Sequence, residues 1–148
     1  MRILVAVDDS KHSEATINVL ANYFKPQSTE VKILHVLIPI TLSALPQMSR
    51  GYAPELEQQG AQARALVDRY AQQLRANDYK VDSAVESGDV RETIIDSAAR
   101  WHADLVLLGS RGHKGMERLL LGSVAESVVR HAGCSVLVVR LPASQGSD

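Results

Sequence analysis

A glycine-bearing basic loop lies between a short apolar run and a helix start in the second half of the chain. It begins with Gly109-Ser110-Arg111-Gly112 and, after nine further residues, reaches Gly122-Ser123. The run Leu105–Leu108 before it is typical of a buried strand, and Ser123–Glu126 has the spacing of a capping box that opens a helix. The backbone N–H groups at such a helix start lack intrahelical partners, and together with the helix dipole they favour an anion. These residues therefore predict a phosphate-binding loop.

Positive charge accompanies the glycines of this loop. Its basic side chains are Arg111, His113, Lys114 and Arg118. A solvated basic loop without a ligand is the simpler alternative. The chain contains no Gly-Lys-Ser/Thr sequence, and the first three loop glycines are spaced by threes without Gly-x-Gly, so neither a Walker A motif nor a dinucleotide fingerprint is present. Gly112 and Gly122 either allow close backbone approach or adopt a positive φ.

The remaining polar motifs do not form a recognisable catalytic or metal centre. Asp8-Asp9 is either a metal-binding pair or, as we favour, one ligand-binding carboxylate followed by a helix cap. His35 is expected to be a packed residue at a strand end. His131 and Cys134 flank Gly133, which indicates a helix C-terminus more than a metal site. No Ser-His-Asp set and no base beside a nucleophile is apparent, so we predict no catalytic residue and no protein-held metal.

Composition restricts the class of protein. The chain has 148 residues, 45% apolar and 22% charged, with a formal net charge of −1, which gives no global attraction to nucleic acid or acidic membranes. The single cysteine, Cys134, excludes an internal disulfide and favours a reducing compartment. The apolar run Ile3–Val7 is too short for a signal-peptide core or a membrane span. We expect a cytoplasmic protein with one domain over residues 1–141 and a flexible tail over 142–148.

Alternating strand and helix patterns predict the fold. We expect strands over residues 3–7, 31–37, 79–86, 105–108 and 135–141. We expect helices over residues 11–24, 55–77, 90–101 and 123–131, with Asp89 capping the third, and a long irregular segment, a possible lid, over 38–54. This order predicts an α/β fold: a three-layer, doubly wound, five-stranded parallel sheet with four helices. With the first strand central the strand order is 3-2-1-4-5, and the crevice lies between the loops after strands one and four.

The spacing Gly109-x-x-Gly112, nine residues, Gly122-Ser123 resembles the ATP-binding signature of the universal stress protein family. The likeness extends over nearly the whole chain. Ile3–Asp8 resembles the family's first strand with its terminal aspartate, and His35-Val36 resembles the end of its second strand. Val136–Val139 resembles its closing strand.

This resemblance implies an ATP site and a divalent cation, Mg²⁺ or Mn²⁺, that bridges the phosphates. It places the adenine and ribose on one wall of the crevice, and the phosphates against the basic loop and the start of the last helix. The nucleotide-binding residues that it implies are Ala6, Asp8, Val36, Gly109, Ser110, Arg111, Gly112, His113, Gly122, Ser123 and Val124.

The function that the resemblance implies is a nucleotide-dependent regulatory or stress-response module with little or no turnover. A slow ATPase and a partner-binding module that uses no nucleotide remain alternatives. An adenylyl-transferring relative of the ATP pyrophosphatases is disfavoured, because the loop after the first strand, Asp8-Asp9-Ser10-Lys11, contains no glycine. We also expect a homodimer through Val136–Val139, since family members pair there and an uncharged apolar edge strand favours pairing. No nucleic-acid or membrane partner is expected.

Overall fold

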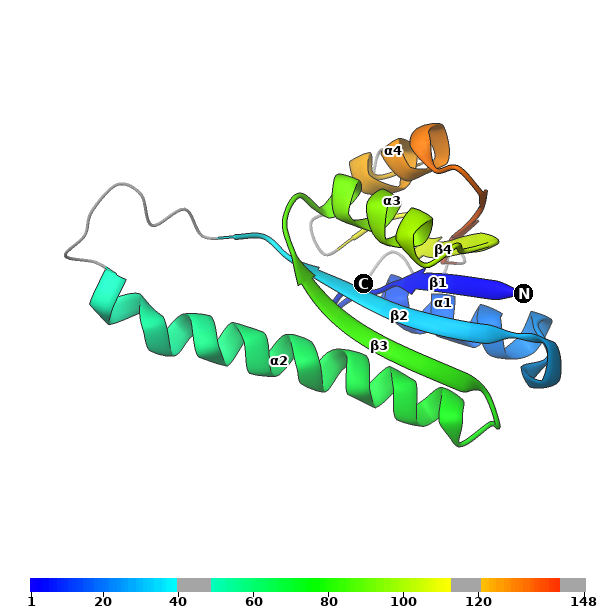
Figure 1. Cartoon of the computed structure of the whole chain (residues 1–148), viewed down its shortest axis with the longest axis horizontal. Helices are drawn as coiled ribbons and strands as arrows, with labels where there is room; N and C mark the ends of the chain where they lie inside the picture. Colours follow the sequence, from blue (N-terminus) through cyan, green and yellow to red (C-terminus); the bar gives the residue numbers. More distant parts are fainter. Residues whose placement is uncertain (40–48, 113–120, 142–148) are drawn as a thin grey trace.

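The N-terminal strand β1 (Arg2–Ala6) is the centre of a five-stranded parallel sheet (Figure 1). The computed structural model describes residues 1–39, 49–112 and 121–141. The other strands are β2 (Glu30–Leu37), β3 (Lys80–Ser87), β4 (Leu105–Gly109) and β5 (Ser135–Val139). The order is β3-β2-β1-β4-β5, which confirms the predicted order and the edge position of the third strand.

The apolar composition of β1 follows from its burial on both faces. Ile3 and Val5 belong to the core on the side of helices α1 (Lys11–Tyr23) and α2 (Ser49–Arg75). Leu4 belongs to the core on the side of α3 (Val90–Arg100) and α4 (Ser123–His131). Because successive strand residues point to opposite faces, a central strand covered twice must be apolar throughout. The predicted three-layer α/β architecture is confirmed.

The register brings the ends of β1 and β4 together. Ala6 pairs with Leu34 of β2 on one side and with Leu108 of β4 on the other. The first strand leads into α1 on one face of the sheet, whereas β4 leads toward α4 on the opposite face. The winding direction therefore reverses between β1 and β4, where ligands bind in doubly wound folds.

Helix α2 differs from the sequence-based prediction at both ends. It runs from Ser49 to Arg75, with Pro54 inside it, instead of from residue 55 to 77. Pro54 is the sixth residue of this 27-residue helix, so its missing N–H costs one backbone hydrogen bond, while the other bonds of the long helix remain. The predicted irregular segment is therefore wrong for residues 49–54, and its part over 40–48 lies outside the described residues.

The remaining boundaries agree closely with the predictions. Strand β5 ends at Val139, two residues before its predicted end, and the other strands shift by about one residue. Asp89 caps α3 as predicted: its side chain accepts a hydrogen bond from the Glu92 N–H at 3.1 Å. The predicted tail over 142–148 lies outside the described residues. In the part of the chain that the structure describes, no helix combines the length and apolarity needed to span a membrane.

Candidate functional site

The two loops singled out by the sequence meet at the carboxyl edge of the sheet. Asp8 lies just beyond β1, and Gly112 lies in the loop that follows β4. A Cβ added to Gly112 would come within 3.0 Å of Asp8 Oδ2. The predicted carboxylate wall and the predicted anion-binding loop therefore face each other across the point where the winding reverses.

Two serines hold the Asp8 side chain. The buried Ser13 hydroxyl accepts a hydrogen bond from the Asp8 N–H at 2.7 Å and donates one to Asp8 Oδ1 at 2.8 Å. The Ser10 hydroxyl donates to the same oxygen. With Oδ1 bound by two hydroxyls, the orientation of the carboxylate is set, and Oδ2 is the oxygen directed toward Gly112.

The helix cap beside Asp8 corrects one prediction. Ser10, and not Asp9, is the N-cap of α1, and its hydroxyl also accepts from the Ser13 N–H at 3.4 Å. A serine oxygen is a preferred N-cap group, and here it serves the helix and Asp8 together. Asp9 is exposed. Among residues 1–39, 49–112 and 121–141, no three His, Cys, Asp or Glu side chains gather in a way that could hold a metal ion.

Backbone hydrogen bonds join the first and last parts of the glycine loop. The buried Ser110 donates its N–H to the Val139 carbonyl at 2.7 Å, and its own carbonyl accepts from the Gly122 N–H at 2.7 Å. A Cβ on Gly122 would lie 3.2 Å from that same Ser110 oxygen. The glycine thus permits a close approach of two backbone segments.

The alternative of a positive φ is wrong for both Gly112 and Gly122. Gly122 has a φ of −69°, and among the described glycines only Gly88 has a positive φ. The requirement for glycine is therefore steric. At Gly112 the neighbour is the Asp8 carboxylate, and at Gly122 it is the backbone of Ser110.

Helix α4 begins without the predicted capping box. Its N-cap is Gly122, no side chain caps it, and Ser123 is the first helical residue. The first turn closes through the backbone instead, since the Glu126 N–H donates to the Gly122 carbonyl at 3.0 Å. The exposed Ser123 hydroxyl is consequently not used as a cap, and the first N–H groups of the helix have no intrahelical acceptor.

The other predicted wall is built by β1 and β2. Near the ends of these strands, Val36 belongs to the buried cluster on one face of the sheet, and the partly buried Ala6 packs against that cluster. The His35 ring donates from Nδ1 to the Val7 carbonyl at 2.7 Å, so it ties the two strand ends together as a packed residue. The structure thus brings Ala6, Asp8 and Val36 to the edge that also carries Gly109–Gly112 and Gly122–Val124, whereas His113, Lys114 and Arg118 lie outside the described residues.

Sequence reasoning missed three residues at this site. Ser10 and Ser13 support Asp8, and His12 lies between them with its Cβ against the Gly109 backbone. Burial lowers the pKa of His12 below its ordinary value, Arg111 lowers it further, and Asp8 acts in the opposite direction. Their positions in the first turn after Asp8 are the only sign of these residues that the sequence provides.

The fold and this edge define a doubly wound α/β domain with an anion-suited loop at its switch point. The model of the universal stress protein family matches residues 1–140. Universal stress protein Sll1388 of Synechocystis sp. is 31% identical, over 94% of this chain and 97% of the relative. Universal stress protein MJ0531 of Methanocaldococcus jannaschii is 30% identical, over 95% of this chain and 82% of the relative. The chain belongs to the universal stress protein family.

Solved structures share the fold. UspA from Lactobacillus plantarum matches with a TM-score of 0.83 and 25% identity, over 95% of this chain and 97% of the other. Two more distant structures contain a nucleotide. A universal stress protein in complex with cAMP has a TM-score of 0.70 and 19% identity, over 94% and 96% of the two chains. An Arabidopsis thaliana family protein with AMP bound has a TM-score of 0.67 and 20% identity, over 98% and 94%.

Proposed function

We propose that this chain binds ATP in the crevice between β1 and β4. Its function would be a nucleotide-dependent regulatory module in a stress response, with little or no turnover. The observation that carries the proposal is the position of Asp8 Oδ2, directed at Gly112 of the loop after β4. One wall thus offers a fixed acceptor for ribose hydroxyls, and the opposite wall offers backbone donors suited to phosphate.

The chemistry of the two walls fits a nucleoside phosphate. Asp8 would accept from the ribose, and the backbone near Ala6 and Val36 would contact the adenine. The N–H groups at the start of α4, with the exposed Ser123 hydroxyl, would bind phosphate oxygens. Arg111 adds positive charge on the same side of the crevice.

Mg²⁺ or Mn²⁺ would bridge the phosphate oxygens and neutralise part of their charge. The described residues contain no cluster of three suitable ligands, so in this proposal the ion is held by phosphates and water. The residues that the proposal assigns to phosphate binding, at 109–113 and 122–124, supply neutral or positive donors, which complement such a complex.

Two relatives support the choice of an adenine nucleotide. One universal stress protein structure contains cAMP, and the Arabidopsis thaliana protein contains AMP. Little or no turnover is proposed because hydrolysis needs a group that positions or activates water. Asp8 is the carboxylate that the described part of the crevice presents, and its Oδ1 already accepts two serine hydroxyls.

Freshly purified protein should retain an adenine nucleotide that native mass spectrometry identifies by its mass.

In calorimetry, Gly122→Val should weaken Mg-ATP binding at least about tenfold, because its side chain would press on the Ser110 carbonyl, 3.2 Å from the Cβ position. Gly133→Val is the matched control, since no atom lies within 4 Å of the Cβ position there. Equal ATP affinity in Gly122→Val and the wild type would contradict the proposed binding of phosphate by this loop. Sustained multiple turnover would favour a slow ATPase instead.

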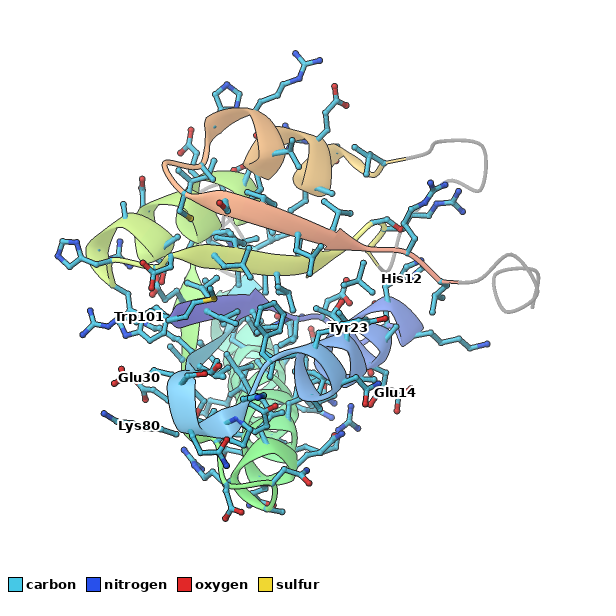
Figure 2. The ribbon with its side chains drawn as sticks, turned by 90° about the vertical axis from the view of Figure 1, so that its right-hand side faces the viewer. His12, Glu14, Tyr23, Glu30, Lys80 and Trp101 are labelled. Carbon is cyan, nitrogen blue, oxygen red and sulfur yellow. The ribbon has the colours of Figure 1, made fainter. Side chains whose placement is uncertain are left out.

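We further propose a homodimer through β5. In the described sheet, β5 is the edge strand beside β4 (Figure 2). Leu137 is 38% exposed, and Val136 and Val138 are partly exposed. Light scattering after size exclusion should give about twice the chain mass of 16.1 kDa at micromolar concentration. Leu137→Lys should shift this mass toward the monomer, because a lysine on an edge strand opposes pairing. A measured mass of 16.1 kDa for the wild type would contradict the proposed dimer.

A further inference from the structure

His12 is a partly buried histidine at the edge of the proposed nucleotide site. It lies in the first turn of α1, at the carboxyl edge of the sheet (Figure 2). A Cβ on Gly109 would come within 2.6 Å of the His12 Cβ and 3.4 Å of its carbonyl carbon. The backbone and Cβ of His12 are therefore fixed beside the end of β4, where the glycine loop starts.

The His12 imidazole has no hydrogen-bond partner among residues 1–39, 49–112 and 121–141. Other histidines of the chain do use their rings: His35 donates to the Val7 carbonyl at 2.7 Å, and His131 contacts the Ser127 carbonyl at 2.9 Å. The His12 ring is only partly buried, and no described side-chain nitrogen or oxygen is buried without a partner, so its nitrogens are open to water or to a ligand. A ring with two polar nitrogens, next to a loop suited to phosphate, therefore has hydrogen-bonding capacity for a ligand.

The charges around His12 oppose its protonation when no ligand is bound. Burial lowers the pKa of the ring, Arg111 in the loop after β4 lowers it further, and Asp8 at the end of β1 raises it. Lys11 and Glu14 of the same helix are exposed. The N-terminal end of α1 also disfavours a cation. The neutral ring is consequently the favoured form in the free protein at neutral pH.

We propose that His12 is a phosphate-contacting residue of the nucleotide site and that its imidazole takes up a proton when the phosphate binds. This inference rests on the proposed nucleotide function. A bound phosphate adds negative charge beside a ring that otherwise faces the positive Arg111. The protonated imidazole then forms a charge-assisted hydrogen bond with a phosphate oxygen, which the neutral ring does less strongly.

The sign of the pH dependence follows from this proton uptake. The complex binds one more proton than the free components, so ATP affinity increases as the pH falls. The gain is complete below the pKa of His12 in the free protein and is lost as the pH rises through its pKa in the complex. A difference of one unit between these two pKa values corresponds to about a tenfold change in affinity.

Nuclear magnetic resonance of the His12 imidazole tests the proton uptake directly. The full-length protein is titrated from about pH 5 to pH 8.5 alone, with saturating Mg-ATP, and with saturating adenosine. Mg-ATP should raise the pKa of His12 by at least about one unit, whereas adenosine, which lacks phosphate, should leave it unchanged. An unchanged pKa with Mg-ATP, or an equal shift with adenosine, would overturn the proposal.

Calorimetry with histidine variants separates His12 from the other titrating groups. His12→Gln should lose at least about threefold of the wild-type gain in Mg-ATP affinity between about pH 8 and pH 5.5. His131→Gln, at the far end of α4, should keep the whole gain, and the titration of ATP itself is common to all variants. If His113→Gln removes the pH dependence and His12→Gln keeps it, the proposal is wrong.

The outcomes also distinguish this inference from the proposed function. If the wild type binds no Mg-ATP, both the proposed function and this inference are wrong. If it binds Mg-ATP normally and the His12 pKa does not respond, only this inference is wrong.

Discussion

Gly109→Ala should lower the free energy of unfolding by about 1–3 kcal/mol and weaken Mg-ATP binding at least about tenfold. The new Cβ would lie 2.6 Å from the His12 Cβ and 3.3 Å from the Arg111 carbonyl oxygen. Neither neighbour is the end of a flexible side chain. The end of β4 and the first turn of α1 must therefore move apart, and this movement displaces the start of the proposed phosphate loop.

Urea denaturation and calorimetry measure the two effects of Gly109→Ala separately. Gly133→Ala provides the control, because no atom lies within 4 Å of the new Cβ and its φ is not positive. We expect this control to change stability by less than about 0.5 kcal/mol and to keep the wild-type affinity. If Gly109→Ala is as stable as the control, the close packing of α1 on the strand end does not constrain the loop.

Burial on both faces made the sheet predictable from sequence. A central parallel strand must be apolar along its whole length, and Ile3–Val5 shows this in three consecutive fully buried residues. Once the strands and helices are placed, the right-handed connections leave few topologies, and the switch point follows from the strand order. The sequence alone therefore assigns Asp8 and Gly112 to facing walls of the crevice.

Local sequence patterns predicted helix starts less reliably. At α4, backbone hydrogen bonds close the first turn without a side-chain cap. Ser123 has the residue type and spacing of an N-cap, yet the Gly122 N–H is already bonded to the Ser110 carbonyl and Gly122 caps α4 without a side chain. The start of α2 was missed for a related reason. A proline usually indicates a helix boundary, but Pro54 lies inside α2, where its missing donor costs one hydrogen bond of a 27-residue helix.

The supporting residues of the site could not be predicted because their roles depend on tertiary contacts. Ser13 is one of several small residues in α1, and only the fold places its hydroxyl against both the N–H and the carboxylate of Asp8. His12 is equally unremarkable in sequence, and its importance comes from the contact with Gly109. Such pairings join residues of different elements, so a pattern within one element does not contain them.

Asp8→Ala should weaken Mg-ATP binding by about ten- to a hundredfold, the effect of losing a hydrogen bond to a charged group. The substitution removes the acceptor that faces Gly112. It leaves the backbone closure of the loop through Ser110 and Gly122 in place. The Ser13 hydroxyl loses one partner but still accepts from the N–H of residue 8, so the folded structure should persist.

Calorimetry with two further variants distinguishes the carboxylate's role from general damage. Asp8→Asn keeps the shape of the side chain but replaces one oxygen with a donor. If Oδ1 remains the acceptor for Ser10 and Ser13, the amide is directed at the ligand, and affinity should fall nearly as far as in Asp8→Ala. Asp9→Ala alters an exposed neighbour of equal charge and should bind as the wild type does. An unchanged dissociation constant in Asp8→Ala would make Asp8 a structural residue of the strand end, because a ribose acceptor cannot be removed without a loss of affinity.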